Sequence, residues 1–338
     1  MTSPAAITTD PDWLPHGFDR TGDALTFVNV PRPARDALTF LSDEHYQGRY
    51  PKQDLPFSSV QLEDGPGRPL HFIFHSSFCC STLLARALEV PGIALSLREP
   101  DILIHLANML VRDEAQRSAQ RLDTTLKLLS RTYAPDEIVI AKPSNFANRL
   151  LEPVLRRDER TRAILLYSDL PTLLRSIAKK GIWGRVYGRQ YYRNILAWTS
   201  MRLGFSAAET FEQTDLQIAA LAWLMQIHQF NEASRSFGAD RVIILDSARF
   251  LEDPAGTLVK AAAFFRIGLK PQAARDIAAG PIFSTHSKLG EAPYSTAERA
   301  SDHGSVDTAH GEEIEIVVKW ITAVAGEAAI PLTSNFPS

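Results

Sequence analysis

A short run of small polar residues stands between an apolar segment and an amphipathic one, and it is the part of this sequence best suited to chemistry. The run 76–82 follows the apolar residues 70–75 and precedes residues 83–88, whose leucines share one helical face. Strand, tight loop and helix in this order bring loop amides and a helix N-terminus to one point, where they favour an anion. The residues expected to hold that anion are Cys79, Cys80, Ser81, Thr82 and Leu83.

Other charged and hydroxyl side chains follow further apolar segments. Glu99 and Lys142 come directly after two of them, and Ser168 and Asp246 come after two more. In open α/β sheets ligands bind beyond the carboxyl ends of the strands, so these side chains are expected at one edge. A lysine, a glutamate and several hydroxyls at one edge predict an anion site with a candidate base.

Short apolar segments alternate with longer helical ones from residue 70 onwards. This alternation predicts a three-layer α/β/α domain of the P-loop type with a mostly parallel central sheet of about five strands. The expected strands are 70–75, 93–97, 138–141, 163–167 and 242–245, and the expected helices are 101–132, 145–156, 170–179 and 214–236.

The remaining segments predict the organisation of the chain around this domain. Residues 1–66 are expected to form an N-terminal extension with a short strand or ribbon and one helix, packed on the core domain 67–325. The stretch 181–205, rich in Gly, Arg and Tyr, is expected to be an insertion or lid. An irregular stretch from about 280 to 311 is expected to end in a helix around 312–323, and 326–338 form a tail.

Composition narrows the class of protein. The chain has 338 residues, 45% of them hydrophobic and 22% charged, as in an ordinary globular protein. A net charge of −3 gives no reason to expect nucleic acid or a membrane as partner. No apolar run approaches the roughly 18 residues of a membrane span, and the N-terminus lacks a signal pattern. The only cysteines, Cys79 and Cys80, are adjacent and expected to be reduced, which fits a cytoplasmic protein.

Four separated segments resemble the sulfotransferase superfamily, which uses 3′-phosphoadenosine 5′-phosphosulfate (PAPS) as sulfuryl donor. Residues 77–84 fall where the family has its 5′-phosphosulfate loop, and Arg98-Glu99-Pro100 is placed like the catalytic glutamate of tyrosylprotein-type members. Residues 165–176 resemble the strand and serine of the 3′-phosphate motif, and 245–268 resemble a late, mostly structural segment. The resemblance covers about 65–290.

Two basic residues of the family pattern are absent from this chain. Phe78 stands in place of the basic loop residue, and Ser168 in place of the arginine of the 3′-phosphate motif, of which only Ser176 is kept. Losing one charge-assisted contact to a phosphate costs about 1.5–3 kcal/mol. The cations that could substitute are Lys142, Arg175, Lys179, Lys180, Arg185 and Arg189.

The resemblance also implies roles for individual residues. Loop amides 79–83 with the Ser81 and Thr82 hydroxyls would hold the 5′-phosphate, and Ser176, Lys180 and Lys288 would bind around the 3′-phosphate and nucleotide. Glu99 would take the proton of an acceptor hydroxyl or amine, presented by a small molecule or peptide, and Lys142 would stabilise the transferred group. No metal is required, and no His/Cys cluster with ligand spacing is present.

Each of these residues also has a structural interpretation, and two other functions stay open. Lys142 could cap a helix or pair with Glu137. Ser81 and Thr82 could cap the helix that they begin, and the role of His75 could be limited to a hydrogen bond with the loop. The missing cations are also compatible with a catalytically impaired binding or scaffold protein. Asp246, after an apolar segment, would be compatible with a nucleotide-dependent kinase, although the loop lacks the G-K-[ST] pattern.

Overall fold

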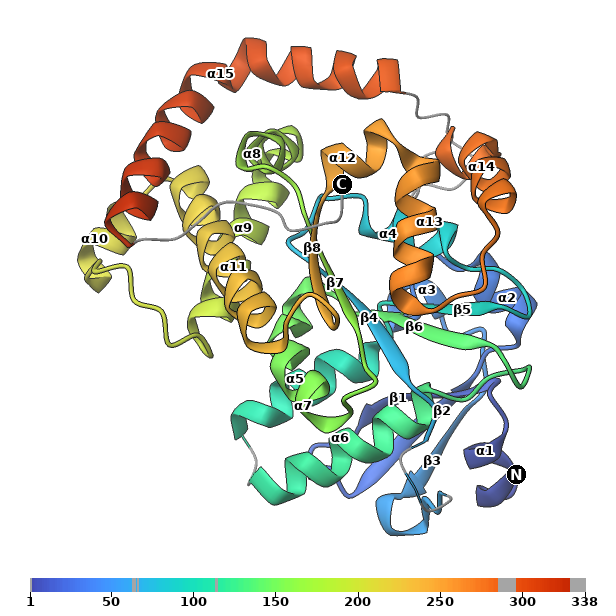
Figure 1. Cartoon of the computed structure of the whole chain (residues 1–338). Coiled ribbons are helices and arrows are strands. Elements are labelled where there is room, and N and C mark those ends of the chain that lie inside the picture. The colour runs from blue at the N-terminus through green and yellow to red at the C-terminus, as the bar shows by residue number, and fades with distance from the viewer. Residues whose placement is uncertain (1, 63–64, 66, 113–114, 285–295, 329–338) are drawn as a thin grey trace.

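A five-stranded parallel sheet forms the centre of the molecule, in the order β5 (Ala94–Arg98), β6 (Ile138–Lys142), β4 (Leu70–His75), β7 (Ala163–Tyr167) and β8 (Val242–Asp246). The structure is a computed structural model and describes residues 2–62, 65, 67–112, 115–284 and 296–328. All five predicted strands are confirmed to within one residue at each end. The three-layer α/β/α fold class is therefore also confirmed (Figure 1).

The strands are mostly apolar because helices cover both faces of the sheet. Alternate side chains of β4 enter different buried clusters: Phe72 and Phe74 belong to one, and Ile73 to the other. Helices α4 (Ser81–Ala87), α12 (Ser247–Glu252), α13 (Pro254–Phe265) and α14 (Pro271–Ala279) pack in the cluster of Ile73. The cluster on the other face is shared with α5 (Asp101–Arg112), α6 (Ala115–Leu129), α7 (Leu151–Arg157), α8 (Leu170–Lys179) and α11 (Asp215–Phe237).

The crossover helices lie where the sequence patterns predict them, but two of the expected helices are each divided into two elements. The expected helix 101–132 is two helices, α5 and α6, and the expected helix 145–156 begins as a 3-10 helix, η2 (Asn145–Leu150), and continues as α7. Helix α11 begins at a capping box in which Thr214 and Gln217 bond each other's backbone N–H. Another 3-10 helix, η3 (Pro281–Phe283), follows α14.

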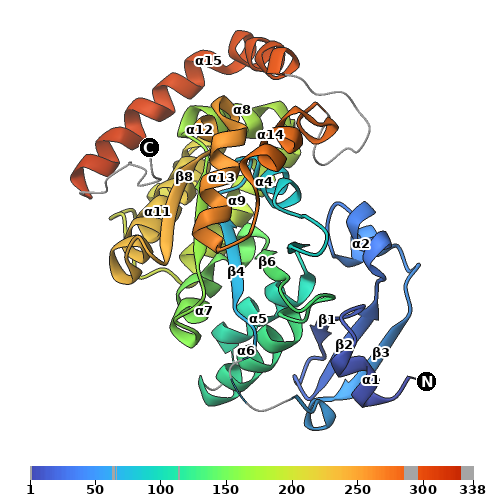
Figure 2. The same ribbon diagram turned by 45° about the vertical axis from the view of Figure 1, so that its right-hand side comes forward.

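The N-terminal region contains more strand than expected. It forms a separate antiparallel sheet, β1 (Trp13–Phe18), β2 (Ala24–Asn29) and β3 (Lys52–Pro56), with α1 (Pro4–Thr9), α2 (Arg32–Ala37), α3 (Asp43–Tyr46) and η1 (Phe57–Ser59). Pro15 and Gly17 interrupt β1 at a register shift, which hides the strand in the sequence. This region, residues 4–59, is called the N-terminal module below, and it lies at the side of the central domain in Figure 2.

The expected lid and the expected irregular tail are largely helical. Residues 181–196 form the continuous helix α9 (Gly181–Leu196), and α10 (Ala207–Glu212) follows it. A Cβ at Gly188 would lie 3.0 Å from the Cβ of Ala219, so α9 lies close against α11. Helix α15 (Thr296–Glu327) begins well before residue 312 and crosses over α8 and α11 (Figure 1). Among the described residues, no helix is both long and apolar enough to cross a membrane.

One histidine in the core makes folding stability depend on pH. His71 is 3% exposed, its ring stacks on Phe265 at 5.3 Å, and its Nδ1 accepts a bond from the Arg162 amide. Burial lowers the pKa of His71 from 6.5 to about 4, so the unfolded chain binds the proton more readily between these values. Acidification from about pH 6.5 to 4 should therefore remove up to about 3 kcal/mol of unfolding free energy.

The variant His71→Asn tests this, because an amide oxygen can replace the acceptor but does not titrate. Denaturant unfolding from pH 7 to 4 should show a smaller acid loss in the variant than in the wild type. Equal acid losses in the two proteins would contradict the assignment to His71.

Candidate functional site

The loop between β4 and α4 has an unusual backbone at the carboxyl edge of the sheet. Ser77, Phe78 and Cys80 have positive φ angles of 77°, 48° and 61°, a backbone conformation that residues other than glycine rarely adopt. Each such residue costs on the order of 1–3 kcal/mol and persists only where the surroundings impose it. Backbone of this kind forms concavities of amide groups that bind anions.

Two buried hydroxyls beside this loop have no hydrogen-bond partner within the described part of the chain. Thr82, in the first turn of α4, is 1% exposed, and Ser168, after β7, is 0% exposed. The backbone around Ser168 is otherwise occupied: its amide bonds the Ser76 hydroxyl at 3.4 Å, and its carbonyl accepts from the Trp223 indole at 2.9 Å. An unsatisfied buried hydroxyl costs about 1–3 kcal/mol, which a bound oxyanion would recover.

Glu99 and Lys142 meet at the ends of the neighbouring strands β5 and β6. The Lys142 Nζ donates to Glu99 Oε1, and the Glu99 amide donates to the Lys142 carbonyl at 2.7 Å. The Lys142 side chain is completely buried, whereas 21% of the Glu99 side chain is exposed. The expected alternative partner of Lys142, Glu137, is instead paired with Arg32 at 2.7 Å. The carboxylate is thus held by a buried cation and still reachable from outside.

Glu99 itself has a left-handed backbone, with φ of 50°. Of the six non-glycine residues with positive φ in the described chain, four lie at this edge of the sheet: Ser77, Phe78, Cys80 and Glu99. Backbone strain is therefore concentrated where the polar side chains gather. Strain gathered in this way is typical of ligand-binding and catalytic sites.

Helix α9 covers the loop with aromatic side chains. Tyr187 bonds the Ser77 hydroxyl, and its ring meets the rings of Phe78 and Phe146 edge-on at 5.4 and 5.6 Å. Burial, and to a smaller extent the negative charge of Glu99, raise the pKa of Tyr187, so its hydroxyl stays protonated. The expected lid is thus a helix that already packs on the loop.

His75 supports the loop through hydrogen bonds of its ring and of its backbone carbonyl. The Ser77 amide donates to His75 Nδ1 at 3.2 Å, so the ring's other nitrogen, Nε2, carries the proton and donates to the Pro143 carbonyl at 3.1 Å. The Asn148 amide donates to the His75 carbonyl and to Gln226 Oε1, both at 2.8 Å. The structural interpretation of His75 accounts for all of these contacts.

The other predicted nucleotide-binding residues are spread over α8 and α9. The Ser176 hydroxyl donates to the Thr172 carbonyl at 2.9 Å, and Lys180 Nζ lies 6.0 Å from the centre of the Phe78 ring. The substitute cations Arg175, Arg185 and Arg189 are paired with Asp307, Glu313 and Asp215 respectively. Lys288 lies outside the described residues.

Neither Cys79 nor Cys80 forms a disulfide, as expected. Cys79 is 1% exposed, and its Sγ donates to the Leu166 carbonyl at 3.4 Å, while Cys80 is half-buried in the loop. Cys79 thus fills space beneath the loop.

Two aromatic residues at the site were not predicted from the sequence. Tyr187 contacts the loop, and the ring centre of Phe40 lies 5.2 Å from Lys142 Nζ. The aromatic stretch around Tyr187 was the available signal for the first. Phe40 gave none, because it stands in a plain apolar segment.

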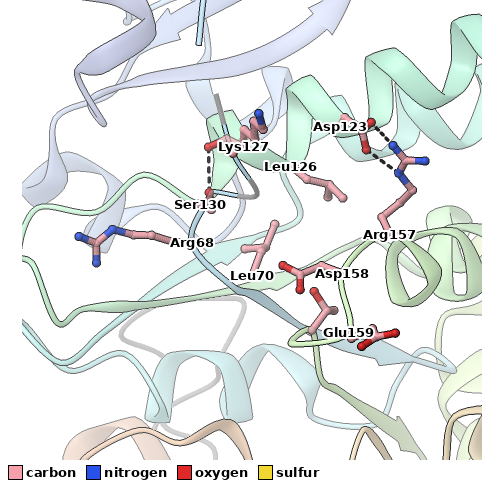
Figure 3. A pocket seen from close by; sticks show the side chains of 11 residues that line it. Arg68, Leu70, Asp123, Leu126, Lys127, Ser130, Arg157, Asp158 and Glu159 are labelled. Atoms are coloured by element: carbon pink, nitrogen blue, oxygen red, sulfur yellow. Dashed lines mark hydrogen bonds and ion pairs between the residues drawn. The ribbon is translucent and has the colours of Figure 1, made fainter. Parts of the chain in front are cut away.

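A depression of about 400 Å³ lies away from this site, at the opposite edge of the sheet. Its wall includes Leu70, the first residue of β4, together with the Asp123–Arg157 ion pair, Lys127 and Ser130 (Figure 3). None of the predicted site residues lines it. The polar residues of the carboxyl edge are thus the better candidate for chemistry.

No family model matches the sequence, and a search of curated proteins gives no match. Among solved structures, the sulfotransferase domain from the curacin biosynthetic pathway is 13% identical, with a TM-score of 0.38 over 80% of this chain and 100% of that one. Sulfotransferase STF1 from Mycobacterium tuberculosis is 16% identical, with a TM-score of 0.40 over 72% and 76%. Mouse sulfotransferase SULT7A1, in complex with PAP, is 11% identical, with a TM-score of 0.31 over 75% and 89%. These proteins are of the class that the sequence motifs resemble.

Replacing the buried hydroxyl of Thr82 by a methyl group should leave the unliganded protein as stable as before, or more stable. In Thr82→Val an unsatisfied polar group is lost and the shape is kept, so the unfolding free energy should stay within about 1 kcal/mol or rise. Thr125→Val is the matched control, because Thr125 in α6 is also fully buried without a hydrogen-bond partner in the described chain. A loss above about 2 kcal/mol in Thr82→Val alone would mean that the hydroxyl has a structural partner.

Proposed function

We propose that this chain is a sulfotransferase that moves a sulfuryl group from PAPS to a hydroxyl or amine acceptor. The observation that carries the proposal is the Glu99–Lys142 pair beside a strained loop with an unpartnered buried hydroxyl. A partly exposed carboxylate is a suitable proton acceptor, and a buried ammonium is a suitable fixed cation. Together they provide the two groups that such a transfer requires.

The residues of the loop suit the phosphates of the donor. Loop amides 79–83 and the hydroxyls of Ser81 and Thr82 would hold the 5′-phosphate, and Ser168, Ser176 and Lys180 would contribute around the 3′-phosphate. Because Phe78 and Ser168 replace the family's two basic residues, binding would depend more on amides and hydroxyls than on cations. When bound, PAPS supplies the sulfuryl group to be transferred.

Glu99 and Lys142 would act together in the transfer. The acceptor oxygen or nitrogen forms a bond to sulfur as the bond from sulfur to the phosphate oxygen breaks, and Glu99 takes the acceptor's proton. Protonation removes the negative charge of Glu99, which then no longer offsets the charge of the Lys142 ammonium. That positive charge becomes available while negative charge grows on the leaving oxygen.

The alternatives are a catalytically impaired sulfotransferase-like scaffold and a kinase. The loop 76–80 contains no basic residue, and Tyr187 of α9 packs on its Phe78 and bonds its Ser77. These features favour the scaffold over the kinase. Against the kinase, Asp246 caps α12 by accepting a bond from the Ala248 amide at 2.8 Å. A carboxylate used as a helix cap does not need a magnesium ion to explain its position.

Calorimetric titration with 3′-phosphoadenosine 5′-phosphate (PAP) tests where the nucleotide binds. The wild type should bind PAP with a dissociation constant in the micromolar range, and neither magnesium nor a chelator should change it. Thr82→Val and Lys142→Ala should each weaken binding by about tenfold or more, and Thr125→Val should not. An absence of binding at millimolar PAP would favour the scaffold, and a requirement for magnesium would favour the kinase.

Glu99→Gln should separate binding from chemistry. The amide cannot accept the acceptor's proton, so PAP release from PAPS with a panel of alcohols, phenols and amines should fall by about 10²–10⁴-fold. PAP affinity should stay within about threefold of the wild type, because Glu99 is not assigned to the nucleotide. An unchanged turnover in Glu99→Gln would exclude Glu99 as the base.

A further inference from the structure

The N-terminal module reaches the Glu99–Lys142 pair through the segment 38–43, which leads from the end of α2 to the first residue of α3. The ring of Phe40 lies over Lys142, with its centre 5.2 Å from Nζ. A cation over an aromatic face is stabilised by the ring, and the ring also keeps water from it. The Phe40 ring thus forms part of the surroundings of the buried Lys142 ammonium.

The backbone of the same segment brackets Glu99. The Leu41 amide donates to the Arg98 carbonyl at 2.8 Å, and the Asp101 amide donates to the Leu41 carbonyl at 3.2 Å. These bonds hold the residue before Glu99 and the one two positions after it. Glu99 lies between the two anchors with its left-handed φ of 50°.

Arg98 ties the start of the segment to the end of β5. Its guanidinium Nη2 donates to the carbonyls of Arg35 and Leu38 at 2.9 Å and of Asp36 at 3.3 Å, and its Nη1 pairs with Glu89. Arg98 is completely buried, so these carbonyls replace the water that the charge has lost. A residue adjacent to Glu99 therefore holds the end of α2 and Leu38 of the N-terminal module.

The far end of the segment is also fixed. The Asp43 amide donates to Asp101 Oδ2 at 2.9 Å, and the Asp43 carboxylate bonds His16 Nε2 of β1 at 2.9 Å. Lys52 of β3 bonds Asp43, and its Nζ lies 3.1 Å from His16 Nε2. His16, Asp43 and Asp101 lie close enough together to hold a metal ion, but the Lys52 ammonium already contacts two of them. The segment is anchored at both ends, with Phe40 between them.

We propose that the segment 38–43 is a positioning element of the active site, contributed by the N-terminal module. It holds Glu99 in its left-handed conformation, and through Phe40 it shields the Lys142 ammonium from water. The catalytic role of the pair rests on the proposed function, whereas the shielding is a property of the folded chain. The main domain without this segment would have the same residues in a looser and wetter site.

Acylation of Lys142 by an amine-reactive ester, followed by peptide mass spectrometry without nucleotide, measures the shielding directly. Phe40→Ala should raise the rate of acylation by about tenfold or more, because local access to the amine increases. Phe40→Leu should restore most of the protection. PAP release from PAPS should fall in Phe40→Ala and recover in Phe40→Leu.

Phe57→Ala is the matched control. Phe57 is another half-buried ring of the N-terminal module, and it lies 5.2 Å from the Arg121 guanidinium, but it has no contact with Lys142. Acylation in Phe57→Ala should match the wild type. Equal acylation in Phe40→Ala and wild type, or an equal rise in Phe57→Ala, would overturn the proposal.

The same experiment separates this proposal from the proposed function. If the wild type neither binds PAP nor releases it from PAPS, the sulfotransferase assignment fails, while the acylation rates still decide whether the segment shields Lys142. If turnover is intact in Phe40→Ala while acylation rises, the segment shields the lysine without positioning the pair, and the positioning role is overturned.

Discussion

The contact on which the rest of the site depends is the ion pair between Lys142 and Glu99. A fully buried ammonium is costly unless a carboxylate and further polar groups compensate it, and removing one partner of such a pair typically costs about 3–5 kcal/mol. The parallel pairing of β5 and β6 brings the two residues to one level, since Arg98 pairs with Lys142 in register. The strand ends, the Glu99 backbone and the segment around Phe40 are all arranged about this contact.

Much of the structure near this pair is less favourable than a stability-optimised fold would be. The loop carries three left-handed residues that are not glycine, and two buried hydroxyls remain without partners in the described chain. Four of the six non-glycine residues with positive φ in the described chain lie at this edge, and backbone strain gathered in this way is a usual mark of a functional site. The cost is carried by a large apolar core on both faces of the sheet, so the loop can stay strained.

The central sheet was predictable because its strands are short, continuous apolar runs such as 163–167, covered on both faces. The strand β1 was not, because Pro15 and Gly17 break its pattern. The strand ends at which Glu99 and Lys142 lie were predictable, and this made the two residues candidates for the site. Their pairing was not, because the order of neighbouring strands depends on contacts far apart in sequence, and Glu137 was an equally plausible partner from sequence alone. Phe40 and Tyr187 reach the site from other elements for the same reason.

A crystal structure of the protein with PAP would place the nucleotide relative to the strained loop and so decide whether the loop is its binding site. We expect a phosphate held by the backbone of residues 79–83, with the Thr82 hydroxyl within hydrogen-bond distance and Lys142 beside the same edge of the sheet. PAP bound elsewhere, for example in the depression around Leu70 and Lys127, would contradict this expectation, as would a loop whose hydroxyls stay unpartnered at saturating PAP.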